Sequence, residues 1–358
     1  MRVLTLGEML VEIVRSTGCH EVSGILAAPC PGGAPVITIS ALARLGVKAG
    51  IIGAVGNDAF GRGLLARLSQ DGVETACVRQ LNGQVTGTLF VTWLADGTRR
   101  TTLHAGAAAQ VKMDWLGEHS LDGCAWFHLA GSTLFLNGEL RSSAYLAAMH
   151  AKERGARISF TPCFGPDARD PAAVRSICAP VLRLCDFLFP TQTEAAVLAC
   201  EEDADRACLS LLEQGPGVVA LKCGTGGSRI FTRQGIEAVD APAPKGPHAG
   251  KNQTHQALRA GSTACDSDAV GDSCYDAGFI YGSLQGWNAK RSAVFAGAMR
   301  ALAAARPGPA RRLAGLEEVH SFLANHDYGQ TDWGARAADP GRHAGTPAEA
   351  IPSPGAVS

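Results

Sequence analysis

The sequence lacks any run of about 18 apolar residues, the length that a membrane-spanning helix requires. It has almost no net charge, because 32 basic side chains stand against 33 acidic ones. A nucleic-acid or anionic-membrane partner reached by bulk electrostatics is therefore not expected. The first ten residues, MRVLTLGEML, also lack the basic region, long apolar stretch and cleavage site of a signal peptide. Together these absences predict a cytoplasmic protein.

Paired cysteines are missing as well. The chain contains 12 cysteines, but none of them form a CxxC pair. Structural zinc sites need closely spaced ligands, so no zinc is expected here. In a reducing compartment, cysteines within apolar segments behave as small core residues. Hydrophobic residues make up 46% of the chain, which is enough for a large core.

What the chain does contain is a regular alternation of strand-like and helix-like segments. The clearest strand patterns are RVLTLGEMLVEIV, KAGIIGAVG, CAWFHLAG, ARISFTP and GVVALKCG. Helical spacing is clearest in APVITISALARLGV, AFGRGLLARLSQDGV, ELRSSAYLAAMHAKERG and PAAVRSICAPVLRLC. This alternation predicts an α/β fold whose mostly parallel sheet is covered on both faces. Two strands around Asp96-Gly97 predict a hairpin that interrupts the rhythm and suggests a small β lid.

Glycine-rich stretches mark two candidate ligand sites. Gly32 and Gly33 directly precede a predicted helix, where the missing Cβ atoms let a ligand approach the backbone. Lys222, Gly224 and Gly227 follow a predicted strand, with a spacing that fits neither a Walker A motif nor a dinucleotide fingerprint. An ordinary turn is the alternative at the first site, and a plain hairpin is the alternative at the second.

Acidic side chains mark two predicted helix starts. Thr191 and Glu194 have the spacing of a capping box, which is the favoured interpretation of this pair. The second start lies in ACDSDAVGDSCYDAGFIYGS, where Gly271, Asp272 and Ser273 precede helical residues. Free N–H groups at a helix start suit a phosphate, and a carboxylate beside them can take a proton from a hydroxyl. An acidic helix cap is the alternative here.

Together and in this order, the motifs resemble the ribokinase-like carbohydrate kinases of the phosphofructokinase-B type. The resemblance runs from about residue 1 to 325, and it is most specific in the stretch from PGGAP to SQDGV. DAGFIYGSLQGW resembles the part of the second family signature that follows the catalytic turn. Members of the tagatose, ketose and 2-keto-3-deoxygluconate kinase type are the most similar in pattern.

The resemblance implies one ribokinase-like domain, an αβα sandwich with a mostly parallel central sheet, over residues 1–327. A small β lid would have its strands within about residues 10–30 and 86–105. Residues 243–267 would be an irregular insertion, because they show no clear apolar period. Residues 328–358 are rich in Gly, Ala and Pro and are predicted to be a disordered tail.

The implied activity is transfer of the γ-phosphoryl group of ATP to a sugar hydroxyl, assisted by Mg²⁺. A monovalent cation is a further cofactor that the resemblance leaves open. Sugar and ATP would be the small-molecule partners. A homodimer through the lid is also expected, since pairing would cover the exposed strand edges. Two alternatives stay open: a catalytically silent relative that binds a sugar or nucleotide, and a nucleoside kinase.

Site roles follow from the resemblance residue by residue. Glu12 stands where the family usually has an Asp that holds sugar hydroxyls, and Gly32 and Gly33 would face the sugar. Thr191 stands where the family usually has Asn, and Glu194 matches a Glu linked to Mg²⁺ and phosphate. The residues expected near ATP are Lys222, Gly224 and Gly227.

Departures from the family pattern gather at the catalytic turn, which usually reads D-T-x-G-A-G-D. If Asp272 is kept as the base, beside Gly271, then Cys274 becomes an extra residue before Tyr275. Aligning backward from YDAGF instead puts Ser273 on the base. Elsewhere Ile37, Thr161 and Cys163 replace polar residues that are common in the family. We expect Asp272 to be the base, Ser273 to be its rival, and the altered turn to impair activity.

Overall fold

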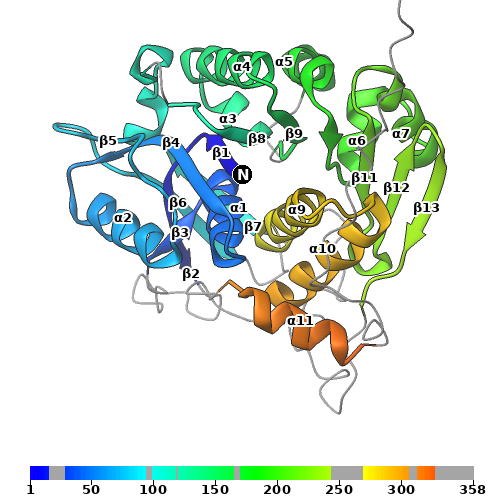
Figure 1. Cartoon of the computed structure of the whole chain (residues 1–358). Coiled ribbons are helices and arrows are strands. Elements are labelled where there is room, and N and C mark those ends of the chain that lie inside the picture. Colours follow the sequence, from blue (N-terminus) through cyan, green and yellow to red (C-terminus); the bar gives the residue numbers. More distant parts are fainter. Residues whose placement is uncertain are drawn as a thin grey trace, which may run out of the picture.

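The computed structural model describes residues 1–15, 29–93, 99–117, 120–164, 170–242, 269–305 and 313–326. Within these residues the chain forms two sheets and two groups of helices (Figure 1). The larger sheet runs through the middle, with helices on both of its faces, as the alternation of patterns predicted. The predicted insertion at 243–267 and the predicted tail at 328–358 lie outside the described residues.

The larger sheet has nine strands in the order β13-β12-β11-β10-β9-β8-β1-β4-β5. Their bounds are β1 (Arg2–Leu6), β4 (Lys48–Gly56), β5 (Val78–Leu81), β8 (Cys124–Ala130), β9 (Arg157–Thr161), β10 (Phe187–Leu188), β11 (Val218–Lys222), β12 (Ser228–Thr232) and β13 (Gly235–Val239). Every pair from β11 to β5 is parallel, and only β12 and β13 run antiparallel to their neighbours. Parallel strands are buried on both faces, which explains their near-continuous apolar sequences.

Helices cover the two faces of this sheet and bury a separate apolar cluster on each. One face carries α1 (Ala34–Arg44), α2 (Ala59–Asp71), α9 (Ala269–Leu284), α10 (Ala289–Ala304) and α11 (Leu316–Ala324). The other carries α3 (Gly131–Leu136), α4 (Gly138–Glu153), α5 (Pro171–Leu184), α6 (Gln192–Ala199) and α7 (Ala204–Glu213). Three 3₁₀ turns complete the order: η1 (Gly106–Gln110), η2 (Met113–Trp115) and η3 (Gly224–Gly226). No described helix is long and apolar enough to cross a bilayer.

The predicted lid is a separate four-stranded sheet in the order β3-β2-β6-β7. Its strands are β2 (Leu10–Arg15), β3 (Cys30–Gly32), β6 (Gly87–Trp93) and β7 (Arg99–His104). The two outer pairs are antiparallel, whereas β2 and β6 in the centre are parallel. The predicted hairpin strands are thus present as β6 and β7, while the Asp96-Gly97 turn itself lies outside the described residues.

Two glycines let α9 lie close against α10, and this contact positions the charged residues of both helices. A Cβ added at Gly278 would lie 2.8 Å from the Cα of Ala296, and one added at Gly282 would lie 2.9 Å from the Cα of Ser292. Real Cβ atoms do not approach other atoms so closely, so both positions require glycine. The described residues of α9 from Gly271 to Ser283 are all buried between α10, α1 and the sheet.

Candidate active site

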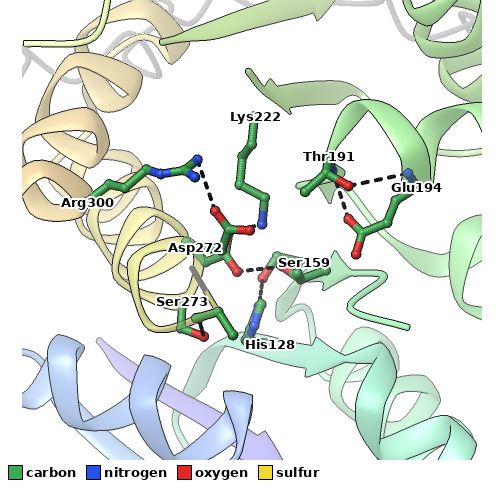
Figure 2. A network of polar contacts seen from close by, with 11 residues as sticks. His128, Ser159, Thr191, Glu194, Lys222, Asp272, Ser273 and Arg300 are labelled. Carbon is green, nitrogen blue, oxygen red and sulfur yellow. Dashed lines mark hydrogen bonds and ion pairs between the residues drawn. The ribbon is translucent and has the colours of Figure 1, made fainter. Parts of the chain in front are cut away.

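Five charged side chains from four elements act on one another near α9 and the sheet, and two ion pairs join four of them. We call them the charged cluster: Asp272, Asp276, Glu194, Lys222 and Arg300. Figure 2 shows four of them, with Lys222 from β11 and Arg300 from α10 directed toward Asp272 on α9, and Glu194 on α6 to one side. If all five are ionised, three carboxylates stand against two cations. The cluster then carries a net charge of −1.

Lys222 and Asp276 form a buried ion pair at the base of the cluster. Lys222 Nζ lies 3.2 Å from Asp276 Oδ1, and the two side chains are only 1% and 2% exposed. Thr161 at the end of β9 donates a hydrogen bond of 2.7 Å to the other carboxylate oxygen. Burial raises the pKa of Asp276 to about 6, although Lys222 and Thr161 act in the opposite direction. Burial also opposes the charge of Lys222, but Asp276, Asp272 and Glu194 outweigh it and raise the pKa of the amine.

Asp272 and Ser273 differ in what their side chains contact. Arg300 Nη1 lies 3.0 Å from Asp272 Oδ1, although this oxygen has no partner with hydrogen-bond geometry among the described residues. Ser273 instead donates its hydroxyl proton back to the carbonyl of Ala269, one turn earlier in the helix, at 2.9 Å. Asp272 is therefore the residue of this pair whose side chain joins the charged cluster. Both residues are buried.

The stretch before Tyr275 was expected to be a turn, and here the structure differs. The residues from Ala269 onward are helical, so Gly271, Asp272 and Ser273 all lie within the first turns of α9. The first four N–H groups of a helix lack partners inside the helix, and its N-terminal end carries a partial positive charge. Asp272 suits this end electrostatically, because a carboxylate in a first turn is stabilised by that charge.

The predicted capping box at the start of α6 is confirmed. Glu194 N donates to Thr191 Oγ1 at 3.3 Å, and Thr191 N donates to Glu194 Oε2 at 2.8 Å. Burial raises the pKa of Glu194, while Lys222 acts to lower it. Thr191 also forms an isolated β-bridge with Lys222, so the cap is tied to the end of β11. Glu194 thus has both a local capping role and a place in the charged cluster.

The three residues expected at the sugar lie together at the root of the lid. Glu12 on β2 pairs with Cys30 on β3, and a Cβ added at Gly32 would lie 3.0 Å from the Cβ of Glu12. Gly33 follows with φ 91°, a left-handed conformation that favours glycine, and it precedes α1 directly. A Cβ added there would lie 2.8 Å from the carbonyl oxygen of Glu8.

Glu8 itself is buried at 2% exposure and accepts hydrogen bonds of 2.6 Å from Ser132 and from Thr133. Burial raises the pKa of Glu8, against the effect of these hydrogen bonds. Cys163 lies within electrostatic range of both Glu8 and the charged cluster. Burial raises the pKa of its thiol, and the charges of Glu194, Lys222, Glu8 and Asp272 also act on it.

The glycines expected beside ATP form the tight turn between β11 and β12. Gly224 has φ 60° and Gly227 has φ 86°, and Cys223 N donates to the carbonyl of Gly227 at 2.9 Å. A Cβ added at Gly227 would lie 2.1 Å from the carbonyl oxygen of Val239, so β13 leaves no room for a side chain. The hairpin that was the alternative interpretation is therefore present, and it lies directly after Lys222.

A second polar group crosses the sheet beneath α9. His128 on β8 shares the hydroxyl of Ser159 on β9 with Trp126, at 2.8 Å to each. Burial lowers the pKa of His128 to about 3, and the nearby charge of Lys222 adds to this effect. His128 is therefore neutral, and it does not add a cation to the charged cluster.

Comparison with known proteins places this arrangement in a family. The profile of the pfkB family of carbohydrate kinases matches residues 7–313, which include both the lid and the charged cluster. The chain belongs to the pfkB carbohydrate kinase family. This confirms the resemblance that the ordered motifs indicated, and it agrees with the mostly parallel sheet and small lid.

Several curated relatives of this pfkB-family chain are fructokinases. The chain is 36% identical over 166 residues to fructokinase-1 of Zea mays, a match that covers 45% of this chain and 50% of that protein. It is 27% identical over 252 residues to a fructokinase of Escherichia coli, covering 67% of this chain and 79% of that protein. The match to the maize protein thus spans about half the length of that relative.

A solved structure matches over nearly the full length of both chains. It is a protein from E. coli with the provisional name ribokinase II, in complex with ATP and Mg²⁺, and its TM-score against this chain is 0.78. The match covers 91% of this chain and 99% of that one, at 29% sequence identity. The ribokinase-like fold of this family member is therefore established over both sheets.

Asp276 and Arg300 are the cluster members that the sequence analysis missed. Asp276 follows Asp272 by four residues, a spacing that places both on one side of a helix. This spacing is visible in the sequence and could have predicted that Asp276 lies beside Asp272. Arg300 gave no such signal, because it stands among small apolar residues of α10. Thr161 was noted only as a lost polar residue, whereas its hydroxyl holds Asp276.

Proposed function

We propose that the protein is an ATP-dependent kinase that phosphorylates a sugar hydroxyl, with Asp272 as the proton acceptor. The position of Asp272 carries this proposal: it lies in the first turn of α9, with Arg300 at 3.0 Å and under the charge of Lys222. A carboxylate takes the proton of an attacking hydroxyl as a general base. The cations beside it offset the negative charge that phosphates bring to the site.

The proposed reaction needs one group that accepts the proton of the sugar hydroxyl. The sugar O–H bond breaks and its proton passes to Asp272, while the oxygen forms a bond to the γ-phosphorus of ATP. The bond from that phosphorus to the bridging oxygen breaks, and ADP leaves with the electron pair. Glu12, Gly32 and Gly33 would hold the sugar at the root of the lid, a role that their close grouping supports.

The E. coli neighbour crystallised with ATP and Mg²⁺ supports ATP as the donor. Mg²⁺ usually binds through phosphate oxygens, water and one or two carboxylates, so it does not need a preformed group of protein ligands. The described residues contain no group of three potential metal ligands. Glu194 is the carboxylate that would face Mg²⁺. When bound, Mg²⁺ would neutralise charge on the phosphates. No observation on the described residues supports a monovalent cation.

Fructose is the first acceptor to test, since both curated relatives described above are named fructokinases. Tagatose-like ketoses and 2-keto-3-deoxygluconate follow, in keeping with the sequence pattern. A nucleoside acceptor ranks lower, because the two curated relatives described above are named for a sugar. Cytoplasmic location stays a prediction.

A catalytically silent binding protein is the second candidate, and one observation favours it. The family's glycine-rich turn is replaced by helix from Ala269, and Asp272 within this helix contacts Arg300. A fixed helix offers less freedom for backbone N–H groups to converge on one oxygen than a turn containing glycines. Under this alternative, sugar or nucleotide binds without turnover.

Turnover decides between the two candidates. Purified protein with ATP and Mg²⁺ is given each sugar in turn, and ADP release is measured. We expect release with one ketose or sugar acid, and a loss of about 10²–10⁴-fold in kcat for Asp272→Asn. Ser273→Ala is the matched control, because its hydroxyl bonds only within the helix among the described residues, and it should keep most of the activity. Full activity in Asp272→Asn would refute the assignment of the base, and binding without ADP release would establish the silent alternative.

We also propose that the lid pairs with the lid of a second copy. Phe90 and Leu103 on β6 and β7 are 45% and 46% exposed, and β3 and β7 are the edge strands of the lid sheet. Edge strands with exposed apolar residues are ready to pair with another chain. Sedimentation velocity should show a dimer, and Leu103→Ser on the edge strand β7 should shift it toward monomer; a monomeric wild-type protein would contradict the proposal.

A further inference from the structure

The ion pair between Arg300 and Asp272 has a geometry that would let another anion take the place of Asp272. The distance of 3.0 Å is that of an ion pair, yet Asp272 Oδ1 has no hydrogen-bond partner among the described residues. A guanidinium bonds a carboxylate most strongly through two parallel N–H···O bonds, and this contact has neither in place. Asp272 therefore competes for Arg300, but holds it less strongly than an anion that accepts two parallel hydrogen bonds would.

Of the two cations in the charged cluster, only Arg300 reaches solvent. Its side chain is 20% exposed, whereas that of Lys222 is 1% exposed and is held by Asp276. A phosphate that entered the cluster would meet a net charge of −1 and would need a cation at its surface. Arginine suits this task, because its planar fork of donors matches the oxygens of a phosphate.

Arg300 also stands near the glycine turn that follows Lys222. Its positive charge acts on the Cys223 thiol beside this turn and on the Tyr275 hydroxyl in α9, while it forms an ion pair with Asp272. Gly224 in this turn has no side chain, and among the described residues beyond its chain neighbours nothing lies within 4 Å of where its Cβ would be, so a ligand can approach the backbone there. A phosphate chain between this turn and α9 would come within reach of Arg300.

We infer that Arg300 binds the phosphates of the nucleotide and pairs with Asp272 only while no nucleotide is bound. This inference rests on the proposed function in taking the ligand to be a nucleoside triphosphate. When the phosphates take the guanidinium, Asp272 loses its partner and its carboxylate becomes available to the acceptor hydroxyl. Arg300 thereby couples occupation of the donor site to release of the base.

Calorimetric titration of MgATP into the full-length protein tests the first half of this inference. Arg300→Met keeps the length and apolar stem of the side chain but removes the charge. We expect it to weaken MgATP binding by about 10- to 100-fold, the loss of one charge-assisted hydrogen-bonded contact. Arg300→Lys should retain part of the affinity. Lys290→Met is the matched control, since it removes one cation from an exposed position of the same helix and should leave affinity unchanged.

A double mutant tests whether Asp272 and the nucleotide compete for Arg300. Asp272→Asn frees the guanidinium, so it should tighten MgATP binding. If the two compete, this gain must shrink when Arg300 is already methionine. Simple repulsion between Asp272 and the phosphates predicts the reverse, because the charge of Asp272 is less screened without Arg300. A gain that is equal or larger in the Arg300→Met background therefore overturns the inference.

Binding and turnover keep this inference separate from the proposed function. Wild-type protein that binds MgATP but phosphorylates no sugar refutes the kinase proposal, while the affinity series still decides the role of Arg300. Unchanged MgATP affinity in Arg300→Met refutes the role of Arg300 even in an active kinase. Thermal unfolding of each variant without nucleotide must match the wild type, and Arg300→Lys serves for comparison if Arg300→Met unfolds at lower temperature.

Discussion

Replacing Lys222 with methionine tests how the charged cluster is held together. Methionine fills a similar volume but leaves Asp276 with only the hydrogen bond from Thr161, at a site where both members of the ion pair are at most 2% exposed. Removal of one partner from a buried pair typically costs about 3–5 kcal/mol, because it strands the other charge. We expect Lys222→Met to lower the free energy of unfolding near neutral pH by this amount.

The opposite change, Asp276→Asn, should cost less. The cluster has two cations and three carboxylates, so its charge is −1; Lys222→Met makes it −2, whereas Asp276→Asn makes it 0. Lys222 also keeps Asp272 and Glu194 as neighbouring charges after this change. A loss of about 1–3 kcal/mol is expected, the cost of one buried group with a weakened partner. The double mutant returns to −1, and its loss should fall short of the sum by about 1–3 kcal/mol.

The pH dependence of these losses has a definite sign. Burial raises the pKa of Asp276 from 3.8 to about 6, so between these values the native protein holds a proton that the unfolded chain has released. Stability from this carboxyl is therefore greatest at low pH and falls as pH rises toward 6, by about 3 kcal/mol for two pKa units. Without Lys222 the pKa of Asp276 rises further, so the deficit of Lys222→Met must be larger near pH 7.5 than near pH 5.

Equilibrium urea unfolding at pH 5 and pH 7.5 measures the free energy of unfolding of all three variants, with tryptophan fluorescence as the probe. Lys290→Met again serves as a control, since its partner Glu237 is 3.9 Å away and both side chains are more than half exposed. Exposed pairs contribute about 0–1 kcal/mol, so this variant should unfold almost as the wild type does. Additive single-mutant losses that do not change with pH would show that Lys222 and Asp276 are not coupled as argued.

Three further predictions concern backbone geometry, and urea unfolding measures each of them. Cys163 has φ 39°, a left-handed conformation that suits asparagine better, so Cys163→Asn should stabilise by about 0.5–1 kcal/mol; destabilisation would remove the argument from strain. Gly278→Ala should destabilise by about 1–3 kcal/mol, because its Cβ would lie 2.8 Å from Ala296 Cα; no change would mean that α10 moves freely. Thr191→Ala removes one half of the capping box and should cost about 1 kcal/mol, with exposed Thr193→Ala as its control.

The architecture was predictable from the sequence because long apolar patterns carry it. The strand pattern KAGIIGAVG coincides with β4 (Lys48–Gly56), and the helical pattern from Ala59 to a glycine stop coincides with α2. Some elements were not predicted, among them the short α3 (Gly131–Leu136) and β5 (Val78–Leu81). Six and four residues are too few to display a period, and tertiary contacts decide their conformation.

The candidate site was predictable only where its contacts are local. The capping box of Thr191 and Glu194 spans three residues, so its spacing is visible in the sequence. Lys222 and Asp276 are 54 residues apart, and Asp276 and Thr161 are 115 apart. No local pattern encodes contacts at such separations, since they arise only when β9, β11 and α9 pack together. The pairing of Arg300 with Asp272 escaped for the same reason.

The rotation of α9 about its own axis determines which groups Asp272 and Ser273 contact. Alignment with the family pattern had left open which of the two residues stands at the base position. Asp276 fixes this rotation, because Lys222 and Thr161 hold its carboxylate against the sheet. A helix turns about 100° per residue, so Asp272 lies about 40° to one side of Asp276 and Ser273 about 60° to the other. The first side faces Arg300 on α10, and the second lets the serine hydroxyl bond back along the helix. An inserted residue before Tyr275 therefore changes which side chain meets the cations, and the anchored Asp276 makes that side chain Asp272.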